Sequence, residues 1–294
     1  MSQDPSRSDH LAALEKEAAC GINPWGRLVW WAGAGLVAVL VLAALVTGNI
    51  WLTKQEQARR QSTLEHDFWV VSHETYPARE RAEAFLRLVA AGNREWRSAR
   101  LDGLSLEGVS LPDTDLQRAD FKDSKMARAV CTGARFAKSK FINTDLTQAE
   151  LTKADLAAAE LFKALLKGAQ LRQANLRGAV LQQVDAPDAS FAGANLCDAY
   201  LLMANLAGAN FSAADLTGAS LEAAVLKGAN LSMARMSGVN LKDADLTDCN
   251  WWRARGLAAE QLALLIKNFP PTEQAAASLR DDYQTWLKKF EPVK

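Results

Sequence analysis

The chain has 294 residues, which allows one or two domains, and its 34 basic and 34 acidic residues balance to a formal net charge of zero. This balance argues against a general nucleic-acid-binding protein, which would carry an excess of positive charge. Its four cysteines lie far apart in the sequence, which argues against a zinc or redox site of the CxxC type and against a dense disulfide scaffold.

The N-terminal part contains one long apolar segment. Between Arg27 and Lys54 there are 26 consecutive uncharged residues, and about 20 helical residues suffice to cross the hydrocarbon core of a membrane. Tryptophans lie near both ends of the segment, where aromatic belts are expected: Trp25, Trp30, Trp31 and Trp51. We predict a polar tail over residues 1–27 and a transmembrane helix over residues 28–52. A buried core helix and a cleavable signal peptide are the alternatives.

The charges that flank this segment indicate its orientation by a narrow margin. Lys16 and Arg27 precede it, whereas Lys54, Arg59 and Arg60 follow it. Because positive residues are retained in the cytoplasm, the margin of one residue favours a cytoplasmic C-terminal part. We therefore expect a single-pass protein of the bacterial inner membrane, with a periplasmic C-terminal part as the alternative.

Residues 53–98 are predicted to form a helical neck. Apolar residues recur at helical spacing in its second half, Pro77 is expected to separate two helices, and Gly92 is a plausible helix stop.

A repeat of five residues follows. Every fifth residue from Leu101 to Trp251 belongs to one unbroken series of 31 positions, of which leucine occupies 21 and phenylalanine five. The residue two places earlier is alanine in 22 of the 31 cases. A period of five matches neither the 3.6-residue period of a helix nor the two-residue period of a strand. It indicates a four-sided solenoid in which each five-residue unit forms one side.

The runs ADLAAAELFKALLKGAQLRQANLRGA and GANLCDAYLLMANLAGANFSAADLTGASL carry this pattern. The pattern resembles the pentapeptide repeat family, whose consensus is A(D/N)LXX, over residues 99–253. This resemblance implies an all-β solenoid, a right-handed quadrilateral β-helix with 20 residues per coil. Thirty-one units at four per coil give 31/4, or about 7.75 coils.

The two recurring apolar positions are expected to fill the bore of this tube. Cys131 and Cys249 fall at such inward positions. At Ala186, a small central residue followed by Pro187, we expect a thinner core, a lost hydrogen-bond donor and a dent in the tube. Leu104 and Val109 are large where alanine is usual, so the first coil is expected to differ and to meet the neck.

Residues 254–294 are predicted to form helices that cap the open end of the tube. The alternative for these helices is dimerisation or the binding of a partner.

Outward residues 20 apart should stack into columns. Most columns carry alternating charges or amides, which indicates structural ladders. One side instead carries apolar residues, which we call the apolar strip: Ile142, Phe162, Leu165, Val180, Tyr200, Leu202 and Met203. We expect the apolar strip to dock another protein or a second copy of the chain. The alternative is that the neck or the terminal helices of the same chain cover it.

A second surface feature is a group of basic residues in the early coils, which we call the basic cluster: Arg118, Lys122, Lys125, Arg128, Arg135, Lys138 and Lys140. The basic cluster is a candidate for contact with anionic lipid headgroups. An ordinary mixture of solvated charges is the alternative.

Three classes of function compete. The chain has no P-loop, HExxH or GxSxG motif, so we predict a non-enzyme with no catalytic, cofactor-binding or metal-binding residues and no cofactor. Some pentapeptide repeat proteins mimic DNA and protect a topoisomerase. Residues 101–251, with 18 acidic and 15 basic residues and thus a net charge of only −3, lack the acidic face that this role needs. We favour a membrane-anchored protein-interaction scaffold or binding module that does not bind nucleic acid. The alternatives are the DNA mimic and an accessory subunit of an enzyme or channel.

Overall fold

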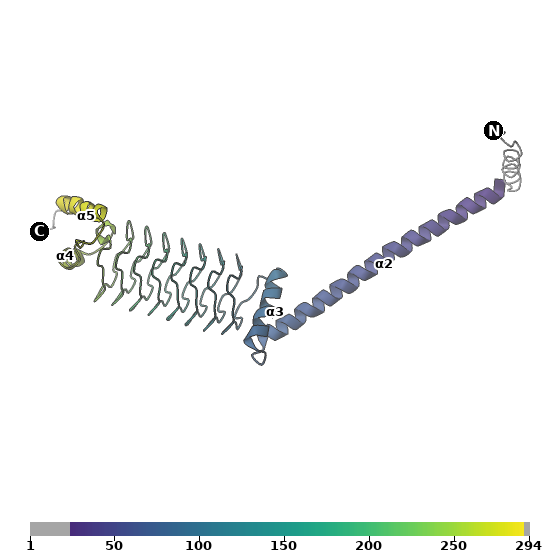
Figure 1. Ribbon diagram of the computed structural model, residues 1–294, viewed down its shortest axis with the longest axis horizontal. Helices are drawn as coiled ribbons and strands as arrows, with labels where there is room; N and C mark the ends of the chain where they lie inside the picture. Colours follow the sequence, from purple (N-terminus) through teal and green to yellow (C-terminus); the bar gives the residue numbers. More distant parts are fainter. Residues whose placement is uncertain (1–23, 291–294) are drawn as a thin grey trace, which may run out of the picture. The chain divides into compact units, whose positions relative to one another are not determined.

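The computed structural model describes residues 24–290, and the chain divides into two compact units, residues 1–63 and 64–294. Each unit is described by itself. The helices in chain order are α2 (Pro24–Ser72), α3 (Ala78–Ala90), the short 3₁₀-helix η1 (Trp251–Arg253), α4 (Ala259–Asn268) and α5 (Ala277–Lys289). The turns of the repeat lie between α3 and η1 (Figure 1).

Helix α2 carries the apolar segment. Its described part is long and apolar enough, by length and composition, to cross a membrane, and none of its apolar window is buried. A signal sequence meets the same test of length and composition. The helix continues past residue 52 to Ser72, so no break separates the predicted transmembrane helix from the first part of the predicted neck. The break comes at residues 73–77, where Pro77 precedes α3. Helix α3 ends at Ala90, and Gly92 adopts the left-handed conformation that follows many helix ends.

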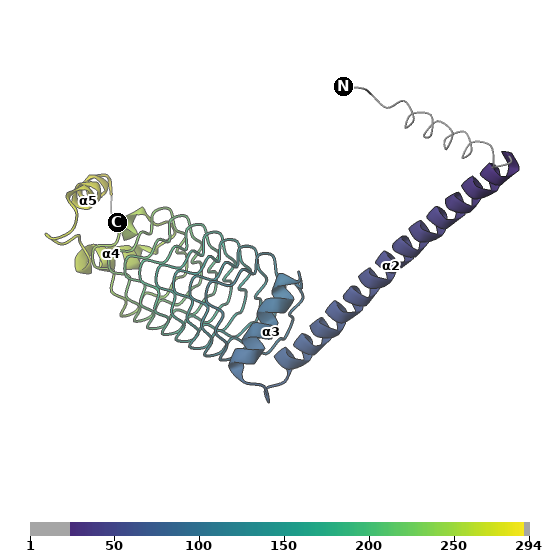
Figure 2. The same cartoon turned by 45° about the vertical axis from the view of Figure 1, so that its right-hand side comes forward.

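The repeat region is a β-helix with 20 residues per coil. Parallel bridges join residues 20 apart along the tube, for example Glu160 to Val180 and Val180 to Tyr200. Figure 2 shows the coils stacked side by side, with α3 across the first coil and α4 and α5 at the last. Each bridge is one residue long, and between residues 24 and 290 there is no longer β-strand. The physical reason is the turn in every five-residue unit, which leaves no room for an extended run.

The bore is filled as the repeat predicts. Both inward positions are buried along almost the whole tube, Cys131 and Cys249 included, and burial raises the pKa of each of these two thiols to about 12. Stacked rings indicate the spacing of the coils. The centroids of Phe121 and Phe141 lie 4.9 Å apart and those of Phe191 and Phe211 4.8 Å apart, in the range expected for neighbouring backbones joined by hydrogen bonds.

The ladder begins one unit before the apolar series that the sequence shows. The Trp96 N–H donates to Asp115 O at 2.7 Å, and Glu95 bridges Asp115, so Trp96 holds the central position of an additional unit. This unit escapes the sequence pattern because Arg94 stands where alanine is usual.

Pro187 lacks a backbone N–H donor, as expected, but no coil-to-coil hydrogen bond is lost there. Each unit uses the N–H of its central residue, of the residue two places later and of the residue before the centre for bonds between coils. The N–H directly after the centre takes no part in this ladder, and Pro187 occupies that position. The Ala186 N–H still donates to Asn205 O at 2.8 Å, and Pro187 O still accepts the Gly168 N–H at 2.9 Å. The coil-to-coil bonds therefore continue through this unit.

In the same unit, the two inward positions carry residues of the opposite size to those in most other units. Val184 fills the position where alanine is usual, and Ala186 fills the position where leucine is usual; both are buried. We expect Ala186→Leu alone to overpack the bore and to lower the free energy of unfolding by about 1–3 kcal/mol. Adding Val184→Ala restores the usual sizes and should recover most of this loss. Urea unfolding of both variants measures the coupling; equal losses in the single and double variants would contradict it.

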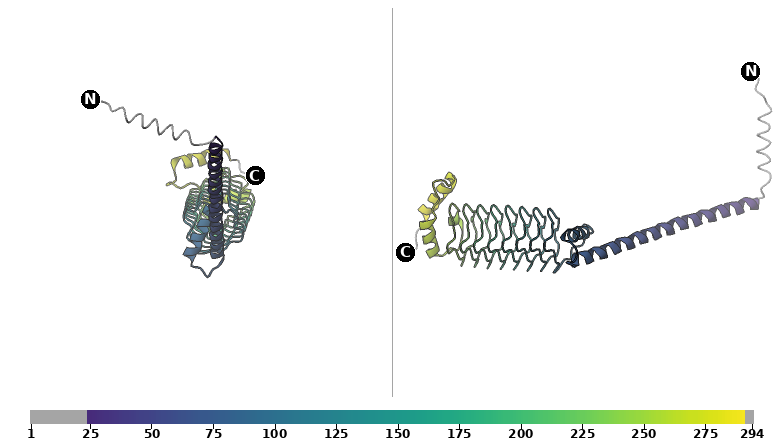
Figure 3. Two further views of the ribbon diagram at one scale, coloured as in Figure 1. Left: turned by 90° about the vertical axis from the view of Figure 1, so that its right-hand side faces the viewer. Right: turned by 60° about the horizontal axis from the view of Figure 1, so that its bottom comes forward.

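Helices lie against both ends of the tube, as the right view of Figure 3 shows. At the first coil the buried Arg81 of α3 donates from Nη2 to Arg100 O at 2.6 Å. At the last coil Trp251 Nε1 donates to Phe269 O at 2.9 Å, and Trp252 Nε1 donates to the carboxylate of Asp282 in α5 at 2.8 Å. These bonds join the terminal helices to the backbone and side chains of the end coils.

Candidate interaction surface

The apolar strip lies almost entirely on one side of the tube. We call this side the Leu181 side, because its central residues are those 20 apart in register with Leu181, from Leu101 to Leu241. Val180 and Tyr200 bridge each other directly, and the Met203 N–H belongs to the same side, donating to Glu222 O. Leu165 stands on the adjacent side, where it bridges Asp145 and Asp185. The periodicity thus places these seven residues together.

Several members of the apolar strip are open to solvent. The exposed fractions of Leu165, Tyr200 and Met203 are 43%, 51% and 56%, and the other four members are half-buried. In the described part of the chain, α3, α4 and α5 bond to the end coils and leave these side chains uncovered. The Nζ of Lys163 lies 5.2 Å from the centroid of the Phe162 ring, so a cation borders the apolar surface.

The basic cluster is spread around the tube. Lys122 and Lys140 are on the Leu181 side, Lys125 and Arg128 on the next side along the chain, and the remaining three on the side that contains Asp115. Ion pairs involve several members: Arg128 with Glu107 at 4.0 Å, Arg135 with Asp115 at 3.2 Å and Lys122 with Asp123 at 3.9 Å. The seven residues therefore surround three of the four sides and form no single basic face.

Two of the predicted columns form ladders of side chains, and a third is joined through its backbone alone. Asn250 donates to Asn230 at 2.9 Å and Asn230 to Asn210 at 3.3 Å. In the column of Asp115, Arg235 pairs with Asp215 at 3.4 Å. The column of Asp120, Lys140 and Glu160 bridges through its backbone, but Lys140 has no ion pair among the described residues. The alternating signs in these columns balance the surface charge along the tube.

Asp115 is the carboxylate that the fold buries most completely in these columns. Arg97 Nε lies 2.6 Å from it, Arg135 Nη2 lies 3.2 Å from it, and the Gln117 N–H donates to it. Burial raises the pKa of Asp115, but the Arg97 hydrogen bond, the Gln117 N–H and the two positive charges together outweigh burial and lower the pKa below its ordinary value. The folded protein thus holds the proton less tightly than the unfolded chain.

A lowered pKa in the folded state means that Asp115 stabilises the fold above its unfolded pKa of about 3.9, and that this contribution is lost as the pH falls through the folded value. We expect Asp115→Asn to lower the free energy of unfolding by about 1–3 kcal/mol at neutral pH. The difference from the wild type should narrow below about pH 4. Urea unfolding between pH 3 and pH 7 measures it, with the exposed Glu150→Gln as the control. A difference independent of pH would contradict this role for the ionised carboxylate.

Sequence reasoning missed a cavity at the last coil. Its volume is about 390 Å³, and it lies between residues 239–246 of the tube and α4. The repeat pattern contains no signal for it, because its second wall comes from a helix outside the repeat.

The comparisons with known proteins agree with the repeat. A family profile described as "Pentapeptide repeats" matches in eight copies, over residues 129–168, 164–201 and 204–243. Alr5209, a pentapeptide repeat protein from Nostoc PCC 7120, is 34% identical, with 36% of this chain and 68% of that chain covered and a TM-score of 0.18. No curated protein matches the chain.

Two further solved structures are similar. HetL, a pentapeptide repeat protein involved in heterocyst differentiation regulation from Nostoc sp. strain PCC 7120, is 29% identical, with coverage of 57% and 95% and a TM-score of 0.20. QnrB1, a plasmid-mediated fluoroquinolone resistance protein, is 19% identical, with coverage of 56% and 94% and a TM-score of 0.39. Because these TM-scores lie below 0.5, the two structures carry no argument about the role of this chain. The repeat register and the eight profile matches show that the chain belongs to the pentapeptide repeat family.

Proposed function

We propose that the protein is a membrane-anchored, non-catalytic scaffold that binds a partner protein on the apolar strip. The observation that carries this proposal is the exposure of Leu165, Tyr200 and Met203 on or beside one side of a tube whose two recurring apolar positions fill the bore. A solvated tube has no need of large apolar residues in register on its outside. A contiguous exposed apolar surface is typical of a binding site for another protein.

The charge pattern supports a scaffold over a DNA mimic. Mimicry of duplex DNA needs a continuous negative face, because the phosphates of DNA form one. Here the column of Asp115 changes sign at Arg135 and again at Asp155, and Arg235 pairs with Asp215 near its other end. Cations also lie next to the apolar strip, as Lys163 does beside Phe162.

Two substitutions on the apolar strip test the proposal. Tyr200→Asp with Met203→Asp places charges on side chains that are already half-exposed, so the tube should still fold. Crosslinking in native membranes followed by mass spectrometry should no longer detect the main crosslinked partner of the wild-type protein in this variant. The control is Met233→Asp, whose side chain is 53% exposed on a different side of the tube. An unchanged set of neighbours in the strip variant would overturn the proposal.

The proposal further places α2 across the membrane, with the repeat in the cytoplasm. Cys20 precedes the apolar segment in the sequence and Cys197 follows it, while Cys131 and Cys249 are buried. Burial raises the pKa of the Cys197 thiol, and its hydrogen bond to Asp215 raises the pKa further. Because the thiolate is the reactive form, labelling with a membrane-impermeant maleimide should be done near pH 8 or above.

In right-side-out vesicles, the Cys197→Ser variant should be labelled at Cys20, and the Cys20→Ser variant only after permeabilisation. The opposite result would assign the repeat to the periplasmic side. Equal labelling of both variants in intact vesicles would contradict a spanning helix.

A further inference from the structure

The last coil of the tube has an open edge on the Leu181 side. Within the tube, each unit of this side donates two N–H groups to the next coil: Leu221 N–H to Asn240 O at 2.8 Å and Ala223 N–H to Lys242 O at 2.9 Å. One coil later the equivalent donors are the N–H groups of Leu241 and Asp243. Neither has an acceptor among the described residues. The Leu246 N–H, around the corner, likewise has none in that part of the chain.

On two other sides of the same coil, at least one N–H donates to the chain beyond the coil. The Met233 N–H donates to Arg253 O at 2.9 Å and the Met236 N–H to Arg255 O at 2.8 Å. On the Leu181 side only the acceptor is satisfied. Gln261 Nε2 donates to Val239 O at 2.8 Å, in the place where a backbone N–H of a further coil would donate. The side-chain amide of Gln261 thus replaces one bond that a further coil would make. The N–H groups of Leu241 and Asp243 remain without acceptors in the described part of the chain.

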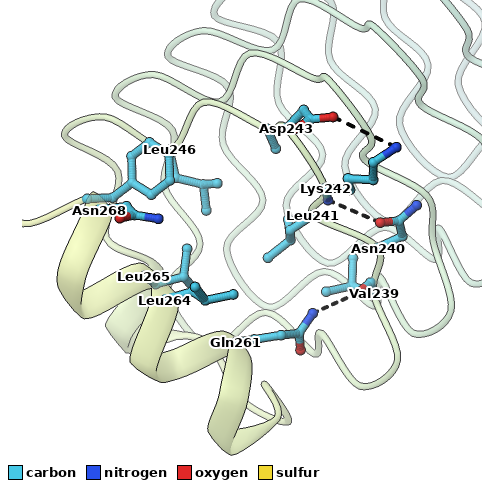
Figure 4. Close-up of a pocket in the computed structure, with 12 residues that line it drawn as sticks. Val239, Asn240, Leu241, Lys242, Asp243, Leu246, Gln261, Leu264, Leu265 and Asn268 are labelled. Carbon is cyan, nitrogen blue, oxygen red and sulfur yellow. Dashed lines mark hydrogen bonds and ion pairs between the residues drawn. The ribbon is translucent and has the colours of Figure 1, made fainter.

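The cavity of about 390 Å³ lies directly at this edge. Figure 4 shows Leu241 and Leu246 on the tube facing Leu264 and Leu265 of α4 across the cavity. Apolar walls beside unpaired backbone donors provide the two elements by which sheet edges bind extended peptides: hydrogen bonds from the backbone and a pocket for a side chain.

We propose that this edge binds an extended segment of a partner protein, which continues the tube by one further side. The segment supplies two carbonyl oxygens to the N–H groups of Leu241 and Asp243 and one large apolar side chain to the cavity. The edge has the same hydrogen-bonding pattern as the interface between coils within the tube. The bound segment would therefore lie on the last coil as the unit of Leu241 lies on the unit of Leu221. This site is independent of the apolar strip.

Charge further specifies the segment. Lys242 Nζ lies 2.9 Å from Glu222, the residue beneath it in the same column, and this pairing raises the pKa of Lys242. The next place in the column is therefore above a cation. An acidic residue directly after the apolar one would continue this column and face the Lys242 ammonium, which also lies 3.9 Å from Asp243. The ligand class is an extended apolar–acidic segment.

A second copy of the chain fits this edge less well. It would approach with the end of its own tube, and α4 stands beside the edge, with its Leu264 58% exposed.

The probe for this proposal is the peptide TGASLEAAV, which copies residues 217–225 and carries a fluorophore at its N-terminus. Fluorescence anisotropy with the full-length protein in detergent should show saturable binding. Leu264→Asp charges the wall of the cavity at an exposed position and should weaken binding by about tenfold or more. Met233→Asp on another side of the last coil is the matched control and should leave binding unchanged. The peptide with Leu221→Asp should not bind, and the peptide with Glu222→Lys should bind several times more weakly.

Absence of saturable binding to the wild-type protein would overturn the proposal. Equal weakening by Leu264→Asp and Met233→Asp would also overturn it, because the effect would then not belong to the edge. If light scattering shows a dimer that Leu264→Asp dissociates, the edge binds a second copy of the chain and the proposal of a partner segment is overturned. The Tyr200→Asp and Met203→Asp variant should bind the peptide normally, so failure of the apolar strip and failure of the edge give different results.

Discussion

Trp251→Ala is expected to lower the free energy of unfolding by about 3–5 kcal/mol, because it removes a large, fully buried side chain at the last central position of the repeat. The indole packs against the rings of Trp252, Tyr283 and Trp286 at centroid distances of 5.6, 6.0 and 5.6 Å. Its Nε1 donates to Phe269 O, so alanine also leaves this carbonyl without its partner.

The loss should be local as well as large. Each coil contacts only its neighbours, so the stability of a repeat protein is approximately a sum over neighbouring coils. Hydrogen exchange of the variant should accelerate at the amides of Leu231 and Met236 and remain slow near Leu151 in the middle of the tube. Met233→Ala, on the surface of the same coil, should change the free energy by no more than about 0.5 kcal/mol. If amide hydrogen exchange accelerated uniformly along the tube, Trp251 would not stabilise the last coil locally.

Phe85→Ala is expected to have a similar effect at the other end, about 3–5 kcal/mol. Phe85 is fully buried on α3, and its ring centroid lies 4.5 Å from that of Trp96, which in turn lies 5.6 Å from Phe68. Removal of this ring separates α3 from the first coil, so the amides of Trp96 and Leu101 should exchange faster.

Leu86→Ala is the control for this change, since Leu86 is the next residue of α3 and is exposed. Urea unfolding should show a much smaller loss for it. The double variant Phe85→Ala and Trp251→Ala should lose the sum of the two single effects, because the sites share no contacts. A loss well below the sum would mean that the two ends are coupled through the tube.

The repeat register predicted most of the tube correctly from particular residues. Cys131 and Cys249 were expected in the bore and are buried there, and the columns of Asn210 and Asp115 form the ladders that a spacing of 20 predicts. These predictions succeed because every unit repeats the same local geometry. The position of one residue in its unit therefore determines its neighbours in the coils above and below.

Where the sequence prediction failed, the reason was a hydrogen-bond pattern or a contact that the period does not contain. Pro187 costs no coil-to-coil bond, because the N–H it lacks is the one that the ladder does not use. Trp96 joins the ladder although Arg94 breaks the alanine pattern before it. The basic cluster lies within residues 118–140 of the sequence but on three sides of the tube, because each coil of 20 residues passes once around all four sides.

The sequence by itself determined which residues point inward, which stack in columns and where the apolar strip runs, because a period of five encodes these relations locally. Only the tertiary structure decided how the tube ends. Gln261 reaches Val239 across 22 residues, and Leu264 faces Leu241, while the donors of Leu241 and Asp243 stay unused. These contacts join the repeat to helices outside it, and no periodic pattern specifies where a non-repeating helix packs.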